Sequence, residues 1–152
     1  MAFLVDSTTS YVEVIVSKDT AIDCSDEDYD KYLETLDESL LKLTCDPTRF
    51  VLRKNLPYEA SQKVMNAQAT YDKGKVQMQM SYVMEEVRAA LIDIKYPDEV
   101  PKEDRLEFKR ESDGLASKHL ISILQGAGVL MDLFRARSAQ SSGPKDDAAK
   151  KK

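Results

Sequence analysis

The sequence predicts an α+β fold that is mostly α-helical: a small helical domain with a minor β component and a disordered C-terminal tail. Over most of the chain, apolar residues recur at spacings of three and four positions, which is the period of a helix with one buried face. Two short runs are instead rich in β-branched residues, as strands are. The last fifteen residues contain no large apolar side chain, so burial cannot offset the entropy lost on ordering them. We therefore expect one mostly helical domain over residues 1–137 and a disordered charged tail over residues 138–152.

The first two predicted elements are a strand and a helix. Residues 11–16 are short and rich in valine and isoleucine, which indicates a strand. A helix is predicted over residues 26–36, with residue 43 as the alternative end, because tyrosines and leucines repeat there at helical spacing. Ser25 precedes this helix and Asp28 follows three residues later, the pattern by which side chains satisfy the free N–H groups of a first turn.

The next three predicted elements are a strand, a helix, and a half-buried strand or extended arm. Pro47 disfavours helical geometry in the residue before it, so residues 48–54 are predicted to be a second strand. A proline is tolerated in a first helical turn, which allows a helix over residues 58–72 that ends at Gly74. Residues 75–80 alternate polar and apolar side chains and are predicted to be a half-buried strand or an extended arm.

Two further helices are predicted in the second half of the chain. Residues 82–94 carry apolar side chains at helical spacing, and prolines follow. Residues 115–137 form the longest apolar stripe in the sequence. The charged stretch 98–113 connects the two helices, and its Leu106 and Phe108 are expected to reach the core.

The last predicted helix has a candidate N-cap and contains two glycines. Ser112 or Asp113 is the predicted N-cap. Gly126 and Gly128 fall inside the helix, where each glycine costs about 0.8–1 kcal/mol relative to alanine. Such a cost suggests close approach of a neighbouring helix, either in the same fold or in a second subunit.

Composition excludes several classes of function. The net charge of −5 argues against a nucleic-acid-binding protein, which needs a basic face. No stretch reaches the roughly 18 apolar residues of a membrane helix, so we expect no membrane partner and a cytoplasmic location. Cys24 and Cys45 are far from metal-ligand spacing, and neither they nor His119 belong to a nucleophile motif. We therefore expect no catalysis, no metal and no cofactor.

Acidic residues concentrate in one segment. Residues 19–38 contain nine acids and Lys31 as the only base, a local net charge of −8. The simplest interpretation is a solvated helix start that the helix dipole favours, and the alternative is an electrostatic partner surface. The residues of this candidate acidic surface are Asp26, Glu27, Asp28, Asp30 and Glu34.

Methionines gather where the alternating segment meets the following helix. Flexible thioether side chains suit surfaces that repack around varied apolar partners, although methionine also fills gaps in ordinary cores. Both interpretations stay open here. The candidate partner-binding residues are Met78, Met80, Val83, Met84 and Val87.

Three short segments together resemble a known protein family. The segment Pro-Thr-Arg-Phe-Val-Leu-Arg-Lys-Asn-Leu occupies residues 47–56, Gly-Lys-Val-Gln-Met occupies residues 74–78, and Val-Arg-Ala-Ala-Leu occupies residues 87–91. In their order, and with the helix between the first two, they resemble the tail assembly chaperones of long-tailed (siphovirus-type) bacteriophages. The resemblance covers roughly residues 11–137.

The resemblance implies a function and a partner. Members of this family are non-enzymatic proteins that bind and solubilise the tape measure protein in the host cell before the tail tube polymerises. On this interpretation the chain is a protein-interaction domain acting in the cytoplasm of the bacterial host, and self-association into a homo-oligomer is left open. The alternatives are a structural phage tail or head-to-tail connector subunit, or a host regulatory protein-binding module.

Overall fold

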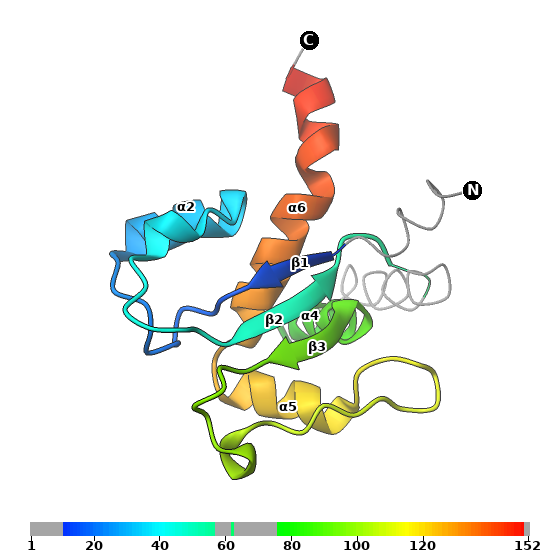
Figure 1. The fold of residues 1–152 in the computed structure, drawn as a ribbon. Helices are drawn as coiled ribbons and strands as arrows, with labels where there is room; N and C mark the ends of the chain where they lie inside the picture. The colour runs from blue at the N-terminus through cyan, green and yellow to red at the C-terminus, as the bar shows by residue number, and fades with distance from the viewer. Residues whose placement is uncertain (1–10, 57–61, 63–75, 151–152) are drawn as a thin grey trace, which may run out of the picture.

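A three-stranded antiparallel sheet lies at the centre of the fold (Figure 1). The computed structural model describes residues 11–56, 62 and 76–150, without the side chains of residues 76–79 and 141–150. The strands are β1 (Tyr11–Val14), β2 (Arg49–Arg53) and β3 (Leu91–Lys95), with β2 in the middle. The helical elements are α2 (Asp26–Thr35), the 3-10 turn η1 (Glu38–Leu41), α4 (Val76–Ala90), the 3-10 turn η2 (Lys102–Asp104), α5 (Lys118–Gly126) and α6 (Leu130–Lys150). The predicted α+β, mostly helical class is confirmed.

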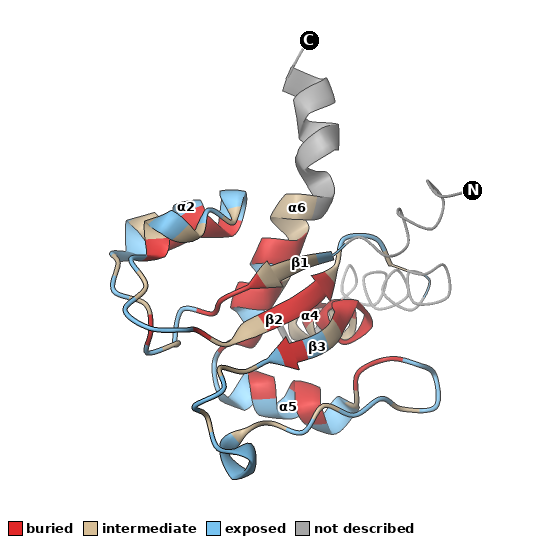
Figure 2. Cartoon of the chain, in the orientation of Figure 1, coloured by how far each residue is buried: buried red, intermediate tan, exposed pale blue. Residues whose placement is uncertain are grey.

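The core lies between one face of the sheet and the helices. Side chains alternate across a strand, so one set from each strand points the same way. Phe50 and Leu52 of β2 share this face with Leu91 and Ile94 of β3, and all four are buried. They belong to one apolar cluster with residues of α4, α5 and α6. In Figure 1 α4 and α6 lie behind the sheet and α5 lies below it, and Figure 2 colours the buried positions. Leu106 and Phe108 pack against this cluster, as predicted.

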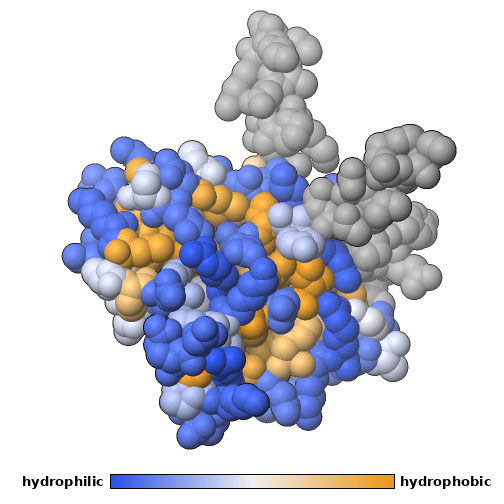
Figure 3. All heavy atoms as spheres, viewed as in Figure 1, coloured by the Kyte–Doolittle hydropathy of each residue, from blue (hydrophilic) through white to orange (hydrophobic). Residues whose placement is uncertain are grey.

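The other face of the sheet carries charged side chains. Glu13 on β1 pairs with Lys95 on β3 across a 2.6 Å contact, and Arg49 on β2 pairs with Glu38. Val51 lies on this face between them, yet it is only 2% exposed. Figure 3, which views the molecule from this side, shows hydrophobic areas broken up by hydrophilic groups.

The acidic helix begins and packs as predicted but ends earlier than its alternative limit. The Ser25 hydroxyl accepts from the N–H of Asp28, and Tyr29, Tyr32 and Leu33 form the buried face. Leu36 adopts left-handed geometry with φ 57°, which ends α2, and η1 replaces the continuation to residue 43. The predicted helix over residues 58–72 lies outside the described residues, apart from residue 62.

The prediction of a strand or arm over residues 75–80 was wrong for residues 76–80, and residue 75 lies outside the described residues. The helix α4 starts at Val76. The polar and apolar alternation over six residues was misleading, because Met80, Val83 and Val87 lie at helical spacing and pack on the core together. The predicted end of the following helix, at residue 94, was also wrong, because α4 ends at Ala90. Residues 91–94 are instead part of β3, which pairs with β2. The same apolar residues fit a strand beside the edge of β2, and a register shift between Val51 and Leu52 accommodates them.

The predicted last helix is two helices. Ser117, and not Ser112 or Asp113, caps α5 by accepting from the N–H of Leu120. Gly126 ends α5, and Gly128 has φ +77°, a left-handed conformation that glycine adopts at little cost. The two glycines therefore mark a turn between helices, which removes the need for a second helix or subunit at this point.

The predicted domain boundary at residue 137 falls within a continuous helix. The helix α6 continues through Arg137 to Lys150, and Gln140 donates from Nε2 to the carbonyl of Glu34 at 3.0 Å. Side chains to Gln140 therefore belong to the packed domain, because they contact α2. For residues 141–152 the disordered tail stays a prediction. Among the described residues, no helix is both long and apolar enough to cross a membrane.

Candidate protein-interaction site

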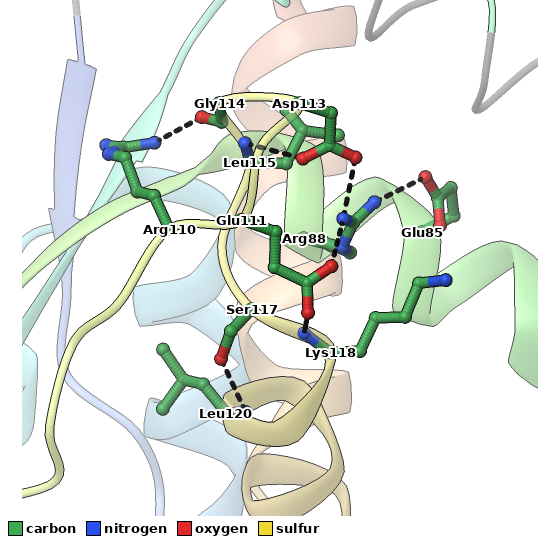
Figure 4. Close-up of polar contacts among 10 residues, drawn as sticks. All are labelled: Glu85, Arg88, Arg110, Glu111, Asp113, Gly114, Leu115, Ser117, Lys118 and Leu120. Carbon is green, nitrogen blue, oxygen red and sulfur yellow. Dashed lines mark hydrogen bonds and ion pairs between the residues drawn. The ribbon is translucent and has the colours of Figure 1, made fainter.

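The side chain of Arg88 is the centre of the most connected polar cluster (Figure 4). It lies in the last turn of α4 and is only 5% exposed. Its Nη2 lies 2.7 Å from Asp113 and 2.9 Å from Glu111, and its Nη1 lies 3.3 Å from Glu85. Burial alone would lower the pKa of Arg88, but the hydrogen bonds and charges of Asp113, Glu85 and Glu111 raise it overall.

The same carboxylates fix the loop that leads into α5. Glu111 also accepts from the backbone N–H of Lys118, and Asp113 accepts from the N–H of Leu115. The bond from Lys118 is the largest cause that lowers the pKa of Glu111. The N–H of Ala116 donates to the carbonyl of Arg88. This loop therefore holds the start of α5 in a fixed position beside α4.

A second buried ion pair holds the other side of α4. Glu86 lies one residue from Glu85 but points towards α6, where Arg137 approaches it at 3.4 Å. Both side chains are buried, and Arg137 also donates to the carbonyl of Lys54 at the end of β2. Ion pairs thus connect α4 both to α6 and to the loop before α5.

A groove runs between α4 and α5 beside this cluster. Half-buried Met84 is its accessible apolar side chain, and Ile121 beside it is only 1% exposed. The other lining residues are polar or charged: Ser81, Glu85, Arg88, Lys118 and Ser122. Ser81 and Ser122 are exposed, whereas Met84 is half-buried. The arrangement suits a partner that brings apolar side chains to the floor of the groove and polar groups to its rim.

The structure separates the predicted methionine set. Val83 and Val87 are 3% and 1% exposed and belong to the core, so they are not part of an accessible partner surface. Met80 and Met84 are half-buried against that core, and only Met84 lines the groove. The side chain of Met78 lies outside the described residues. The predicted continuous strip fails because helical geometry turns its valines inward.

The predicted acidic residues do share one helix. Asp26, Glu27, Asp30 and Glu34 are exposed on α2, and Asp28 is half-buried. Asp30 pairs with Arg135 of α6 at 3.0 Å. The set therefore lies on the solvent side of α2, away from the groove lined by Met84.

The candidates that were set aside for catalysis differ in exposure. His119 and Cys45 are exposed, and Cys24 is half-buried with its pKa raised by burial and by Asp28. Among the described residues, no group of three or more His, Cys, Asp or Glu side chains could hold a metal ion. Sequence reasoning missed Arg88, since its partners Glu111 and Asp113 lie 23 and 25 residues away and no local spacing connects them.

Comparison with known proteins gives no relative on which to base an assignment. No family model matches the chain, no curated protein matches it, and no solved structure matches its fold.

Proposed function

We propose that this protein is a non-enzymatic tail assembly chaperone of a long-tailed bacteriophage, which binds the tape measure protein in the cytoplasm of the bacterial host. The observation that carries the proposal is the groove between α4 and α5, with its apolar floor and charged rim. An amphipathic helix places its apolar side chains in a groove of this kind and leaves its polar face in water.

Charge supports the same function. A long helix with an apolar stripe aggregates when that stripe is exposed, so its chaperone must cover the stripe and keep the complex soluble. The chain has a net charge of −5, and the exposed acids of α2 lie away from the groove. Bound copies would therefore repel one another through their outer surfaces, which opposes precipitation of the complex.

Two observations separate a chaperone from a structural subunit. We expect the gene to lie just upstream of a very long open reading frame, and we expect mass spectrometry of purified particles to lack this protein. Its presence in finished particles would identify a tail or connector subunit instead.

The groove is tested by blocking it without disturbing the core. Ser81→Arg and Ser122→Arg each place a long charged side chain at the exposed rim. In co-purification with the tape measure protein, we expect each to weaken binding by about tenfold or more, about 1.4 kcal/mol. Ser112→Arg, at an exposed position outside the groove, is the matched control and should bind normally. Full binding by both groove variants, with unchanged circular dichroism, would exclude this groove as the site.

A further inference from the structure

Two arginines donate to backbone carbonyls near the start of β3, and no carboxylate in the described part of the chain pairs with either. Arg53 ends β2, and its Nη1 donates to the carbonyl of Ala89 at 2.6 Å. Arg110 donates from Nη1 to the carbonyl of Gly114 at 2.7 Å and from Nη2 to that of Ile92 at 3.2 Å. Neither arginine forms an ion pair with any residue in the described part of the chain. Burial, together with the positive charge of Arg110, lowers the pKa of Arg53, which agrees with their proximity.

The acids next to Arg110 in the sequence, Glu111 and Asp113, pair with another residue. Figure 4 shows the carboxylates of Glu111 and Asp113 turned towards Arg88, whereas the guanidinium of Arg110 points away from them. In a chain with 27 acids and 22 bases, two adjacent arginines that lack a carboxylate are unexpected. Among the described residues, no carboxylate neutralises this positive charge.

Both guanidiniums are held in place and still have free donors. The carbonyl bonds fix each arginine at one end, and the guanidinium of Arg110 lies 5.3 Å from the ring centre of Phe108. A guanidinium carries five N–H donors, and the protein acceptors in the described residues use one from Arg53 and two from Arg110. Tyr11 is paired with Arg53 across the sheet and is 52% exposed.

We propose that Arg53 and Arg110 form a binding site for the carboxylates of an acidic peptide segment. A guanidinium binds a carboxylate through two parallel N–H···O bonds, and preorganised arginines lose little freedom on binding. A nucleic acid is a poorer fit, because it needs a basic stripe that an acidic chain does not provide. The site is separate from the groove between α4 and α5, so either can fail without the other.

The test uses a short capped polyglutamate peptide with a fluorescent label and measures its anisotropy. We expect the wild-type protein to bind at about 20 mM salt and to lose affinity as salt rises to about 500 mM. Arg53→Gln/Arg110→Gln should weaken binding by about tenfold or more. Lys31→Gln/Lys102→Gln changes the net charge equally at exposed positions away from the site and should bind as the wild type does. Absence of wild-type binding, equal losses in the two double variants, or equal binding of an oligonucleotide would overturn the proposal.

Because Arg53 also bonds to the carbonyl of Ala89, a second variant guards against misfolding. Arg53→Lys/Arg110→Lys keeps both charges and loses the forked geometry, so binding should fall between that of the wild type and the glutamine variant. Lysine variants that bind as weakly as the glutamine variant while folded would exclude a purely electrostatic site and support recognition by the fork. Lysine variants that bind fully would overturn the bidentate site.

Carboxylates could come from another protein or from α2 of a second copy. Sedimentation velocity at low salt separates the sources. Self-association that is lost in both Asp26→Asn/Glu27→Gln and the arginine double variant identifies a second copy as the ligand. A monomer that still binds the peptide identifies an acidic segment of a different protein.

Discussion

Arg88 is charged, buried and surrounded by three acids, so its removal should affect the whole fold. In Arg88→Met, three carboxylates lose their cation, and the loop before α5 keeps only the bonds that do not involve Arg88, such as those that Glu111 and Asp113 accept from backbone N–H groups. We expect the free energy of unfolding to fall by about 2–4 kcal/mol, since the carboxylates are partly solvated. Urea denaturation measures the change.

The matched control for Arg88 is a surface arginine. Arg135 pairs with Asp30, and both side chains are about half exposed. Arg135→Met should therefore cost less than about 1 kcal/mol. Equal costs for the two variants would mean that the Arg88 cluster contributes no more than a surface ion pair.

Tyr32 makes stability depend on alkaline pH. Burial raises the pKa of Tyr32 to about 12, and its hydroxyl accepts from the N–H of Ile15. The folded pKa exceeds the ordinary value of 10.0, so the unfolded chain releases this proton first. The stability from this difference is present below about pH 10 and is lost as the pH rises towards 12.

This pH dependence is measured as the free energy of unfolding between pH 8 and about pH 11. The Tyr32→Phe variant has no proton to lose at this position, so its stability should fall less steeply over this range. It should also be less stable at pH 8 by about 1–3 kcal/mol, because the N–H of Ile15 loses its acceptor. Parallel pH curves for the two proteins would contradict the role given to this tyrosine.

Local patterns could be predicted at the residue scale, and distant pairs could not. The Ser25 cap and the buried face of α2 follow from spacings within one helix, and both were correct. The pair of Glu86 and Arg137 joins residues 51 positions apart, so no periodicity connects them. Of the seven residues that line the groove, only Met84 was predicted from the sequence, because the loop that fixes the other side depends on the distant contacts of Arg88.

At the element scale, the errors lie where one sequence fits two geometries. Leu91 and Ile94 continue the helical spacing of α4, and they also fit a strand with an irregular register. The edge of β2 decides between the two, because a strand there satisfies backbone groups of both partners. The choice depends on a tertiary contact with β2, so it cannot be predicted from the local sequence.

In the turn between α5 and α6, alanine at two nearby glycines should change the stability of the fold in opposite directions. Gly128 has φ +77°, so Gly128→Ala should destabilise the fold by about 1 kcal/mol or more. The nearby Cε of Lys18, 2.9 Å from the new Cβ, can move, so backbone strain is the main cost. Gly126→Ala is the matched control. Its Cβ meets nothing within 4 Å, and a gain of up to about 1 kcal/mol is expected.

Thermal unfolding of the two alanine variants measures both effects. A loss at Gly128 with a gain at Gly126 would confirm that the left-handed conformation ends the helix pair. Similar changes at both sites would contradict it.

At the scale of the whole molecule, the contacts of α6 determine how many C-terminal residues can be removed without loss of stability. A chain ending at Gln140 keeps the bond to Glu34 and the pair of Arg137 with Glu86. Its free energy of unfolding should stay within about 0.5 kcal/mol of the full chain. A chain ending at Ala136 leaves Glu86 buried without its cation and should lose about 3–5 kcal/mol.

Chemical denaturation of the two shortened chains against the full chain decides this boundary. Equal stability of all three would show that Arg137 and Gln140 add nothing to the domain. A large loss in the longer one would place essential contacts beyond Gln140.

The contacts of α2 also have a consequence in time. Arg135 donates to Asp30 and Gln140 donates to the carbonyl of Glu34, so these bonds join residues 105 and 106 positions apart. Ribosomes add roughly 5–20 residues per second, so α2 leaves the ribosome roughly 5–20 s before the helix that covers its tyrosines and leucines exists. During that interval its apolar face is open to whatever binds nascent chains, while its many acids keep neighbouring unfinished chains apart.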